Sequence, residues 1–373
     1  MTRTSVAEAR GAAPLYGQPL LTIDLGAIAA NWRDLAARGA PGAVAGVVKA
    51  DAYGLGVAAV APALRAAGCR HFFVACLTEG LALRGILGPG PMIAVLEGFP
   101  PGADGDAALV PVLNSLDEVA AQAAAARAAG VARRAILHID TGMARLGLDA
   151  GELARLSADH GMLAGLDLLY VMTHLACADE PEHPLNAEQA ARFATACAGL
   201  PACRRSLANS SGMFLGAGFA SDLARPGCAL YGVNPTPGTA NLMRQAVRLA
   251  APVLQVREIP AGATVGYGAS WTASRPSRIA TVAAGYADGY LRSLSGRASA
   301  DFRGRPIPLV ARVSMDLTTF DVTDHPDIVP GESLVLIGGE GCTPDEVAAR
   351  AGTIGYEILT SLGARYARSY VGG

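Results

Sequence analysis

Lys49 is the only lysine in this sequence of 373 residues, although the chain contains 30 basic residues. A compositional bias that replaces lysine with arginine wherever only a positive charge is needed would explain the other 29, which are all arginine. A lysine amine can lose its proton and form an imine with a carbonyl compound, whereas a guanidinium stays protonated. Lys49 is therefore a candidate for covalent chemistry, with a lysine retained by chance as the alternative interpretation.

Polar residues that could bind a ligand or transfer protons follow several other short apolar segments. Arg145 follows the segment at residues 135–139, His174 ends the one at 166–174, Asn209 and Ser210 stand at the end of the one at 205–209, and Arg225 with Gly227 lies on the one at 224–232. Some of them also have a purely structural interpretation: His174 can be a hydrogen-bonded core histidine, Ser210 a helix N-cap, and Arg225 an ion-pair partner. The choice between these interpretations depends on whether the fold brings the segment ends together.

The apolar segments themselves predict the strands of a barrel. Eight β-like runs alternate with alanine-rich, helix-prone stretches, at residues 44–49, 71–75, 92–96, 109–113, 135–139, 166–174, 205–209 and 224–232. Connecting stretches such as LDEVAAQAAAARAAG have the apolar spacing and terminal glycine of amphipathic helices packed on a parallel sheet. Eight strand–helix repeats favour an α/β fold, a (β/α)8 TIM-like barrel, with a doubly wound open sheet as the alternative. A barrel would gather the polar residues at the carboxyl ends of its strands.

The pattern changes after about residue 244. Short alternating β-like pieces such as APVLQVREI and IPLVARVSMDLTTFDV are interrupted by Gly, Pro and Asp, and helical periodicity returns only near TPDEVAARAG. This pattern predicts a smaller, mainly antiparallel β domain. We therefore expect residues 1–243 to form the cofactor-binding barrel and residues 244–373 to form a C-terminal β domain.

Composition argues against several classes of function. With 51% apolar residues, a formal net charge of −2 and a pI near 6.3, the chain can bury a large core and has no electrostatic reason to bind nucleic acid or an anionic membrane. No apolar stretch has the length of a signal peptide or a transmembrane helix. Seven cysteines at irregular spacing, without a C-x-x-C pair, predict reduced thiols and no metal site. We expect a cytoplasmic protein that acts on a small molecule.

Two of the segment ends could bind a phosphate group. NSSG and RPGCALYG offer hydroxyl groups and backbone N–H groups close to glycine, which suit an anion. Glycine alone is weak evidence in a chain with 45 glycines. A reactive lysine, a phosphate cradle and cationic side chains on one barrel face together suggest pyridoxal phosphate as the cofactor.

Nine short motifs resemble those of the alanine racemases, in the same order. They are VVKADAYGLG (47–56), DTGMARLG (140–147), THLACAD (173–179), ANSSG (208–212), RPGCALYG (225–232), VGYGASW (265–271), AAGYADGY (283–290), ARVSMD (311–316) and TIGYEIL (353–359). The resemblance extends from about LTIDLGAIAAN to the end of the chain. It implies an isomerase that interconverts L- and D-alanine by a two-base mechanism through an external aldimine of pyridoxal phosphate, and supplies D-alanine for cell-wall peptidoglycan. A catabolic alanine racemase, or a racemase of broader specificity that also accepts serine, remains an alternative.

The resemblance also implies a role for each site residue. Lys49 and Tyr267 would be the two bases, on opposite faces of the substrate Cα. The cofactor would be bound by Lys49, Tyr53, His174, Asn209, Ser210, Arg225, Gly227, Cys228 and Tyr356. The substrate would be bound by Arg145, Met315, Tyr267, Tyr286 and Arg312. Arg225 would face the pyridine nitrogen and oppose its protonation, which limits side reactions.

Two further expectations come from the family. Its Tyr267 equivalent reaches the active site of a neighbouring subunit, so we expect a homodimer with shared active sites. The family often carries a carbamylated lysine two residues before the DTGMARLG motif, where it orients the substrate-binding arginine. This chain has His138 there, which cannot be carbamylated. We expect His138 to be a buried, hydrogen-bonded barrel residue; an anion or another carboxylate could take the place of the carbamate.

Two other classes of barrel protein with pyridoxal phosphate fit the residues less well. A non-catalytic carrier of the cofactor would share Lys49 and the phosphate-binding residues but would lack the β domain and Tyr267. A decarboxylase of the same architecture would place an acidic residue where this chain has Arg225, and a cysteine where it has Tyr267. The residues at these two positions therefore favour a racemase.

Overall fold

The computed structural model describes residues 17–100 and 108–373, which form two compact units. The barrel unit comprises Ile28–Leu230 and Asn234–Met243. The C-terminal unit comprises Tyr231–Val233, Arg244–Gly373 and, at the start of the described chain, residues 17–27. These units differ from the expected domains, residues 1–243 and 244–373, because the first strand of the chain pairs with strands near its end.

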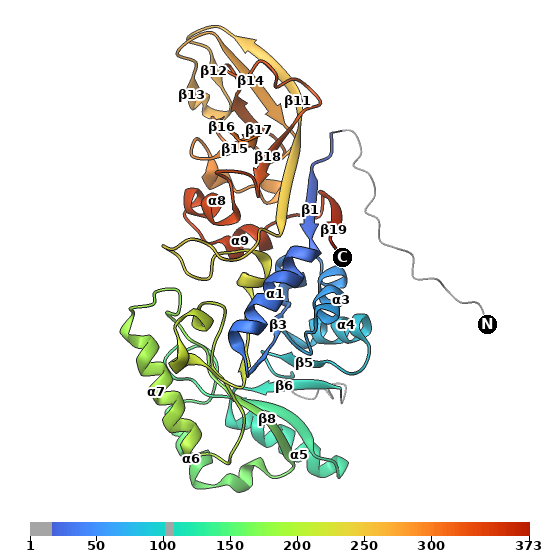
Figure 1. The fold of residues 1–373 in the computed structure, drawn as a ribbon, viewed down its shortest axis with the longest axis vertical. Coiled ribbons are helices and arrows are strands. Elements are labelled where there is room, and N and C mark those ends of the chain that lie inside the picture. Colours follow the sequence, from blue (N-terminus) through green and yellow to red (C-terminus); the bar gives the residue numbers. More distant parts are fainter. Residues whose placement is uncertain (1–16, 101–107) are drawn as a thin grey trace, which may run out of the picture. The chain divides into compact units, whose positions relative to one another are not determined.

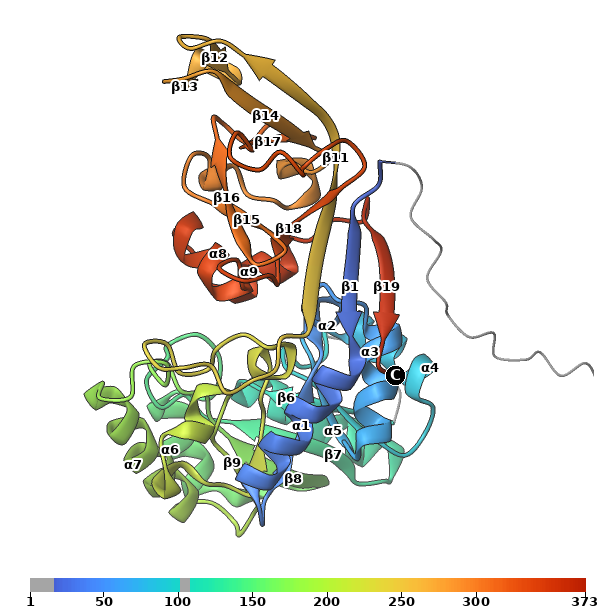
Figure 2. The same cartoon turned by 45° about the horizontal axis from the view of Figure 1, so that its top comes forward.

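Parallel strands form the centre of the barrel unit, among them the strands labelled β6 to β9 in Figure 2. Seven strands make one sheet in chain order: β3 (Gly46–Val47), β4 (His71–Val74), β5 (Met92–Val95), β6 (Leu109–Leu113), β7 (Arg133–His138), β8 (Leu166–Met172) and β9 (Arg205–Ser206). An eighth, β10 (Leu223–Ala224), pairs in parallel with β2 (Ala43–Val44), which lies one residue before β3. On its other side the Arg225 N–H donates to the carbonyl oxygen of Ala208 (2.8 Å), so the strands close into a ring. The predicted (β/α)8 barrel is thereby confirmed, and the open-sheet alternative is excluded.

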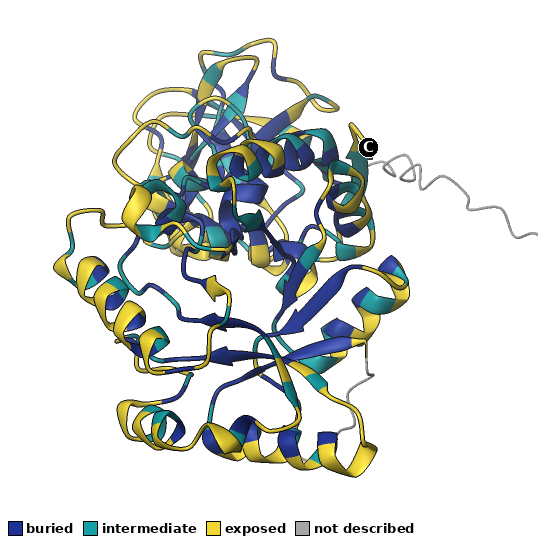
Figure 3. Ribbon diagram, turned by 60° about the horizontal axis from the view of Figure 1, so that its bottom comes forward, coloured by how far each residue is buried: buried dark blue, intermediate teal, exposed yellow. Residues whose placement is uncertain are grey.

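Amphipathic helices cover the outside of this ring. They are α1 (Leu25–Gly39), α3 (Val57–Ala67), α4 (Leu77–Leu87), α5 (Leu116–Ala129), α6 (Ala150–Ala158) and α7 (Pro184–Ala198). In Figure 3 the strands are coloured almost entirely as buried, whereas the helices carry exposed residues on one side. The sequence specifies where some of them begin: the Ser115 hydroxyl accepts the Glu118 N–H, and Asp149 and Glu152 form a capping box. No helix in the described part of the chain has both the length and the apolarity to cross a bilayer.

The alternation of side chains along β7 determines what faces the barrel interior. Ala135 and Leu137 are buried in a cluster with Leu116 and Val119 of α5. Burial of a leucine side chain contributes roughly 1.5–3 kcal/mol, so this face of the strand is held firmly against the helices. Because successive side chains of a strand point to opposite faces, His138 is directed to the other side, towards the barrel interior.

The C-terminal unit is built on a mainly antiparallel sheet, as expected. Its strand order is β14 (Ser277–Val282), β17 (Thr318–Asp321), β16 (Arg305–Val310), β15 (Ser299–Phe302), β18 (Ser333–Ile337), β11 (Val247–Ile259), β1 (Leu20–Asp24) and β19 (Ala367–Val371). β1 is antiparallel to β11 and parallel to β19, and the three run side by side in Figure 1. β12 (Thr264–Val265) and β13 (Trp271–Thr272) form a separate hairpin. Two helices, α8 (Pro344–Ala351) and α9 (Gly355–Thr360), precede β19.

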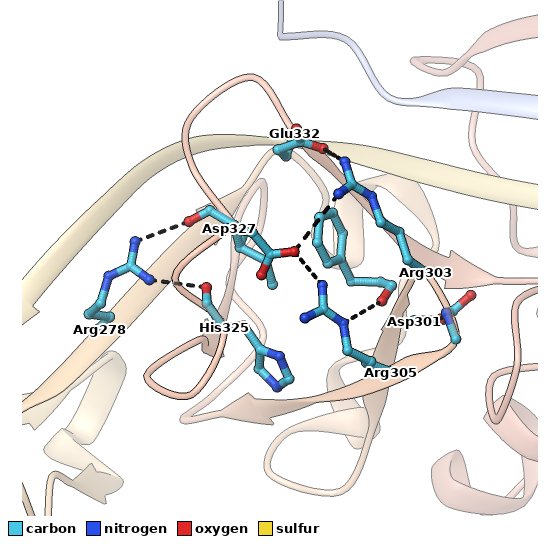
Figure 4. Close-up of polar contacts among 10 residues, drawn as sticks. Arg278, Asp301, Arg303, Arg305, His325, Asp327 and Glu332 are labelled. Atoms are coloured by element: carbon cyan, nitrogen blue, oxygen red, sulfur yellow. Dashed lines mark hydrogen bonds and ion pairs between the residues drawn. The ribbon is translucent and has the colours of Figure 1, made fainter.

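A group of arginines orders the segment between β17 and β18 (Figure 4). Arg278 of β14 donates to the carbonyl oxygens of His325 (3.0 Å) and Ile328 (3.1 Å). Arg305 forms an ion pair with Asp327 (2.5 Å). Exposed ion pairs stabilise a protein by at most about 1 kcal/mol, so this network positions the segment more than it adds stability.

Candidate active site

The backbone that follows β3 adopts a left-handed helical turn. After Lys49, the four residues Ala50, Asp51, Ala52 and Tyr53 have φ values of 51°, 54°, 55° and 56°. This conformation costs roughly 1–2 kcal/mol for each residue other than glycine. Hydrogen bonds that tie the turn to the residues flanking it offset part of that cost, including Ala52 N–H to Val48 O (2.9 Å) and Val57 N–H to the Asp51 carboxylate (2.8 Å). The turn, labelled α2 (Lys49–Tyr53), holds Lys49 at its start and Tyr53 at its end.

The surroundings of Lys49 favour its neutral amine. Burial lowers the pKa of Lys49 most, and the positive charge of Arg145 lowers it further. The carboxylates of Glu79 and Glu97 oppose these effects. A lysine that gives up its proton more readily is a better nucleophile and base, which is the chemistry expected of this residue.

Tyr53, Ser210 and Gly227 converge in a way that fits a phosphate group. The Ser210 hydroxyl oxygen accepts the N–H groups of Gly227 (2.9 Å) and Ala229 (3.4 Å). A Cβ atom on Gly227 would lie 2.1 Å from the Tyr53 hydroxyl oxygen, so only glycine fits there. Burial raises the pKa of Tyr53, which keeps its hydroxyl protonated and able to donate. Neutral hydroxyl donors and backbone N–H groups are the groups that bind a phosphate dianion.

The N-cap interpretation of Ser210 is wrong. Ser210 precedes a 3₁₀ turn, Ser211–Phe214, but its side chain makes no capping hydrogen bond there. Asn209 has that function instead, because its side-chain oxygen accepts the Gly212 N–H (2.9 Å). The Ser210 hydroxyl is instead bonded to the backbone N–H groups of Gly227 and Ala229, on either side of the buried Cys228.

Arg225 is a buried cation with neutral neighbours. Its side chain is 4% exposed and donates to the Ser206 hydroxyl (2.5 Å) and the Thr173 carbonyl oxygen (2.6 Å). Within the described chain it makes no ion pair, so the ion-pair interpretation is also wrong. Burial lowers the pKa of Arg225 to about 10, so the guanidinium still carries its charge at neutral pH.

Two histidines beside this cation are held neutral. His174 approaches Arg225 with its Nδ1 atom at 3.4 Å, and burial together with the charges of Arg225 and Arg145 holds the pKa of His174 well below its usual range. Burial lowers the pKa of His138 to about 4, assisted by Arg225. Both imidazoles are therefore uncharged at neutral pH.

His138 is buried and hydrogen-bonded, as the sequence predicts. Its Nδ1 lies 2.8 Å from the Asn114 side-chain oxygen. Asn114 uses its amide nitrogen to donate to the carbonyl oxygens of Leu96 and Val112 (3.1 Å each), so its oxygen must face the histidine. His138 consequently carries its proton on Nδ1, and its Nε2 has a lone pair. Asn114 is a site neighbour that sequence reasoning missed, because 24 residues separate the two side chains.

Arg145 is exposed on a loop that folds back onto β7. The Asp140 carboxylate accepts the N–H groups of Gly142 (2.9 Å) and Met143 (2.9 Å), which forms a tight turn. The Leu148 N–H then donates to the carbonyl oxygen of His138 (2.9 Å) and closes the loop. The binding role of Arg145 stays a prediction.

The fold brings most of the expected residues to one end of the barrel. Lys49, Tyr53, Arg145, His174, Asn209, Ser210, Arg225, Gly227 and Cys228 all follow, or lie just beyond, the carboxyl ends of parallel strands. The sequence did not identify Ser206 and Thr173, which bind Arg225. Thr173 could have been suspected because it precedes His174, whereas nothing in the sequence pointed to Ser206. The remaining expected residues, Tyr267, Tyr286, Arg312, Met315 and Tyr356, belong to the C-terminal unit.

Three loops of the C-terminal unit bring four of its expected residues onto one surface. The Tyr286 N–H donates to Ser314 O (3.0 Å), and the Ala287 N–H donates to Met315 O (2.9 Å), so two of the loops are paired. The third loop carries Tyr267, and a Cβ on its Gly268 would lie 3.1 Å from the Arg312 guanidinium. This surface exposes three large hydrophobic side chains: Tyr267 is 71% exposed, Met315 53% and Tyr286 40%.

Tyr356 belongs to a helix of the C-terminal unit. It lies half-buried near the start of α9, next to Gly355, where a Cβ would come within 2.9 Å of Val233. The contact of Tyr356 with a cofactor phosphate stays a prediction.

Comparison with known proteins agrees with this site. Residues 23–235 match the family model "Alanine racemase, N-terminal domain", and residues 246–370 match "Alanine racemase, C-terminal domain". The chain belongs to the alanine racemase family. It is 61% identical to the alanine racemase of Acidiphilium cryptum, over 94% of this chain and 98% of the relative. It is 49% identical to a catabolic alanine racemase of Mesorhizobium japonicum, over 95% and 93% of the two chains.

Solved structures of the family have the same fold. The alanine racemase of Bartonella henselae, whose crystal structure contains covalently bound pyridoxal phosphate, is 42% identical. It superposes with a TM-score of 0.91 over 95% of this chain and 99% of its own. The biosynthetic alanine racemase of Pseudomonas aeruginosa is 36% identical, with a TM-score of 0.84 over 95% and 99% of the two chains.

Proposed function

We propose that this chain is an alanine racemase, an isomerase that interconverts L- and D-alanine with pyridoxal phosphate as its cofactor. The observation that carries the proposal is the position of Lys49. The only lysine of the chain stands just after a barrel strand, four residues before Tyr53, whose hydroxyl lies against Gly227. Family membership supports the same reaction.

The residues at the barrel end fit this cofactor. Lys49 would hold it covalently, and the phosphate would be bound by Tyr53, Ser210 and the N–H groups of Gly227 and Cys228, with Tyr356 and Asn209 nearby. When bound, pyridoxal phosphate supplies a conjugated ring that delocalises the negative charge left on the substrate Cα. Arg225 would face the ring nitrogen, since it is a buried cation whose partners are all neutral.

Proton transfer requires one base on each face of the substrate Cα. Lys49 would accept the proton on one side through its Nζ atom, because burial and Arg145 favour its neutral amine. The Tyr267 hydroxyl would serve the other side. Arg145 and the Met315 N–H would bind the substrate carboxylate, and Tyr286 and Arg312 would line the way in.

The second base would come from a partner subunit. Tyr267 is 71% exposed on its own chain, together with Tyr286 and Met315. Exposed apolar side chains that cluster in this way are typical of an interaction surface. The proposed homodimer would cover them and place Tyr267 in the partner's barrel, so that each active site is shared.

Hybrid dimers test the shared site. Mixing the inactive Lys49→Arg and Tyr267→Phe proteins should restore part of the activity, because one site of each hybrid then has both bases. The shared active site would be contradicted if analytical ultracentrifugation showed only monomer. It would also be contradicted if activity did not return in samples in which mass spectrometry proves that subunits have exchanged.

The reaction itself can be tested directly. Purified protein with pyridoxal phosphate should form D-alanine from L-alanine, measured by chiral chromatography, and should exchange the Cα proton for deuterium in D2O. The ratio kcat/KM for serine, measured in parallel, determines whether the specificity is broader. A protein that binds the cofactor but leaves both amino acids unchanged would contradict the proposal.

The proposed cellular role is supply of D-alanine for peptidoglycan, in the cytoplasm. A catabolic role is the second candidate, since relatives named as catabolic alanine racemases are 49% and 48% identical. Deletion of the gene in the source organism separates the two. A requirement for added D-alanine supports the biosynthetic role, whereas loss of growth on alanine as carbon source alone supports the catabolic one.

A further inference from the structure

The left-handed turn between Lys49 and Tyr53 needs external support. Its four residues other than glycine occupy a region of φ that side chains rarely adopt. The N–H of Ala50, the first of them, points away from the bonds inside the turn. Its partner is therefore outside the turn, either water or another part of the protein.

Glu79 is that partner. It is the third residue of α4, and one of its carboxylate oxygens accepts the Ala50 N–H at 2.7 Å. The other oxygen accepts the N–H of Ala75, which follows β4, at 2.8 Å. A single half-buried carboxylate thus ties the first left-handed residue to the end of the neighbouring strand. Hydrogen bonds to an ionised acceptor are about twice as strong as neutral ones.

The same carboxylate acts on the charge of Lys49. Lys49 is adjacent to Ala50 in the chain, and the groups around it come from several barrel loops. Arg145 and burial favour the neutral amine, whereas Glu79 and Glu97 favour the ammonium form. The nearby His174 is uncharged at neutral pH. Removal of the Glu79 charge would leave Glu97 as the remaining acidic group that acts on the lysine.

We infer that Glu79 is a positioning residue for Lys49 and Tyr53. By binding the N–H groups of Ala50 and Ala75 together, it holds the left-handed turn that separates the amine from the phosphate-binding hydroxyl. The roles of those two groups rest on the proposed function; the clamp itself does not.

The chain contains a matched control. Glu152 is the third residue of α6, and its two carboxylate oxygens also bind two backbone N–H groups, those of Leu116 (2.9 Å) and Asp149 (3.2 Å). It bridges neighbouring segments of the same barrel but contacts neither end of the left-handed turn. Glu79→Gln and Glu152→Gln therefore make the same chemical change, but only the first removes a carboxylate that binds the left-handed turn.

Hydrogen exchange of the protein without cofactor provides the first measurement. In Glu79→Gln the amides of residues 50–56 should exchange about tenfold faster or more, the change expected from the loss of one charge-assisted hydrogen bond. Glu152→Gln should leave these amides unchanged. Equal acceleration in the two variants, or none in Glu79→Gln, would overturn the inference.

Labelling of Lys49 provides the second measurement, again without cofactor. Lys49 is the only lysine, so acetic anhydride labels a single side-chain amine, which mass spectrometry separates from the α-amino group. In Glu79→Gln the pH of half-maximal labelling should fall, because an acidic neighbour is lost; in Glu152→Gln it should not move. An unchanged labelling profile in Glu79→Gln would also contradict the inference.

A second variant covers failure of Glu79→Gln to fold. Glu79→Asp keeps the charge but is one methylene shorter, so it can reach only one of the two N–H groups. It should speed exchange of residues 50–56 while leaving the labelling pH near that of the native protein. Slow exchange in this variant would refute the two-point clamp. If the clamp is supported but the native protein racemises nothing, the proposed function fails and the positioning role remains.

Discussion

A methyl group added at Gly227 should damage phosphate binding without straining the backbone. The new Cβ would lie 2.1 Å from the Tyr53 hydroxyl oxygen and 2.9 Å from the ring carbon that bears it. Tyr53 is 7% exposed and is held in the left-handed turn, so it cannot swing into solvent. Gly227 is absent from the positions with positive φ, which means that alanine would meet a steric obstacle only.

The magnitude follows from these contacts. Overpacking of this kind costs about 1–3 kcal/mol in the free energy of unfolding. Displacement of the Tyr53 hydroxyl would remove one hydrogen bond to a charged phosphate, worth roughly 1.5–3 kcal/mol, or about ten- to a hundredfold in cofactor affinity. Tyr53→Phe in the Gly227→Ala background should recover part of the stability, because it removes the closer contact and leaves the one at 2.9 Å.

Comparing two ligands, one with a phosphate group and one without, makes the binding assay specific for the phosphate cradle. Isothermal titration of the protein without cofactor should show that Gly227→Ala weakens pyridoxal phosphate strongly but pyridoxal, which lacks the phosphate, very little. Gly218→Ala is the control, since a Cβ there meets nothing within 4 Å. An equal loss of affinity for both ligands, or native affinity for pyridoxal phosphate, would refute the assignment of the cradle.

Three further predictions concern the bases and the buried histidine. Lys49→Arg should abolish both racemisation and the visible absorbance of the bound cofactor, and absorbance retained in a spectrophotometer would refute the covalent role of Lys49. Tyr267→Phe should bind the cofactor normally yet lose most D-alanine formation from L-alanine; a near-native rate would mean that another group is the second base. His138 has a pKa of about 4 in the folded protein against about 6.5 unfolded, so roughly 3 kcal/mol of stability is fully present above pH 6.5 and is lost as the pH falls towards 4. Urea unfolding at pH 7 and pH 4.5 should show a smaller pH dependence in His138→Gln, and an unchanged dependence would contradict the buried neutral imidazole.

Local pattern predicted the number and place of the barrel strands well, but not their length. The run at residues 224–232 was expected to be a strand, whereas β10 ends at Ala224. The backbone leaves the sheet there because the N–H groups of Gly227 and Ala229 bind the Ser210 hydroxyl. A hydrogen bond across 17 residues leaves no trace in the local apolar pattern.

Two features contradict local preference altogether. Residues 50–53 contain no glycine, yet they are left-handed, because Glu79 accepts the Ala50 N–H of the turn and Asp51 accepts the Val57 N–H at the start of α3. The first strand, β1, was expected to belong to the barrel domain, yet it pairs with β11 and β19, more than 200 residues away in the chain. Strand pairing between distant segments depends on the whole fold and not on the sequence of either strand alone.

The sequence by itself determined which chemical groups are available: a single lysine, an arginine in place of an acid at position 225, and glycine where a phosphate must approach. The apolar periodicity also determined that parallel strands would bring these groups to one face. Only the tertiary structure decided their charge and orientation. Burial lowers the pKa values of both Lys49 and His138. The charge of Arg145 lowers that of Lys49 further, and the charge of Arg225 lowers that of His138, although each arginine lies far along the chain from the residue on which it acts. Because charge states depend on solvation and distance in space, they emerge only when the chain has folded.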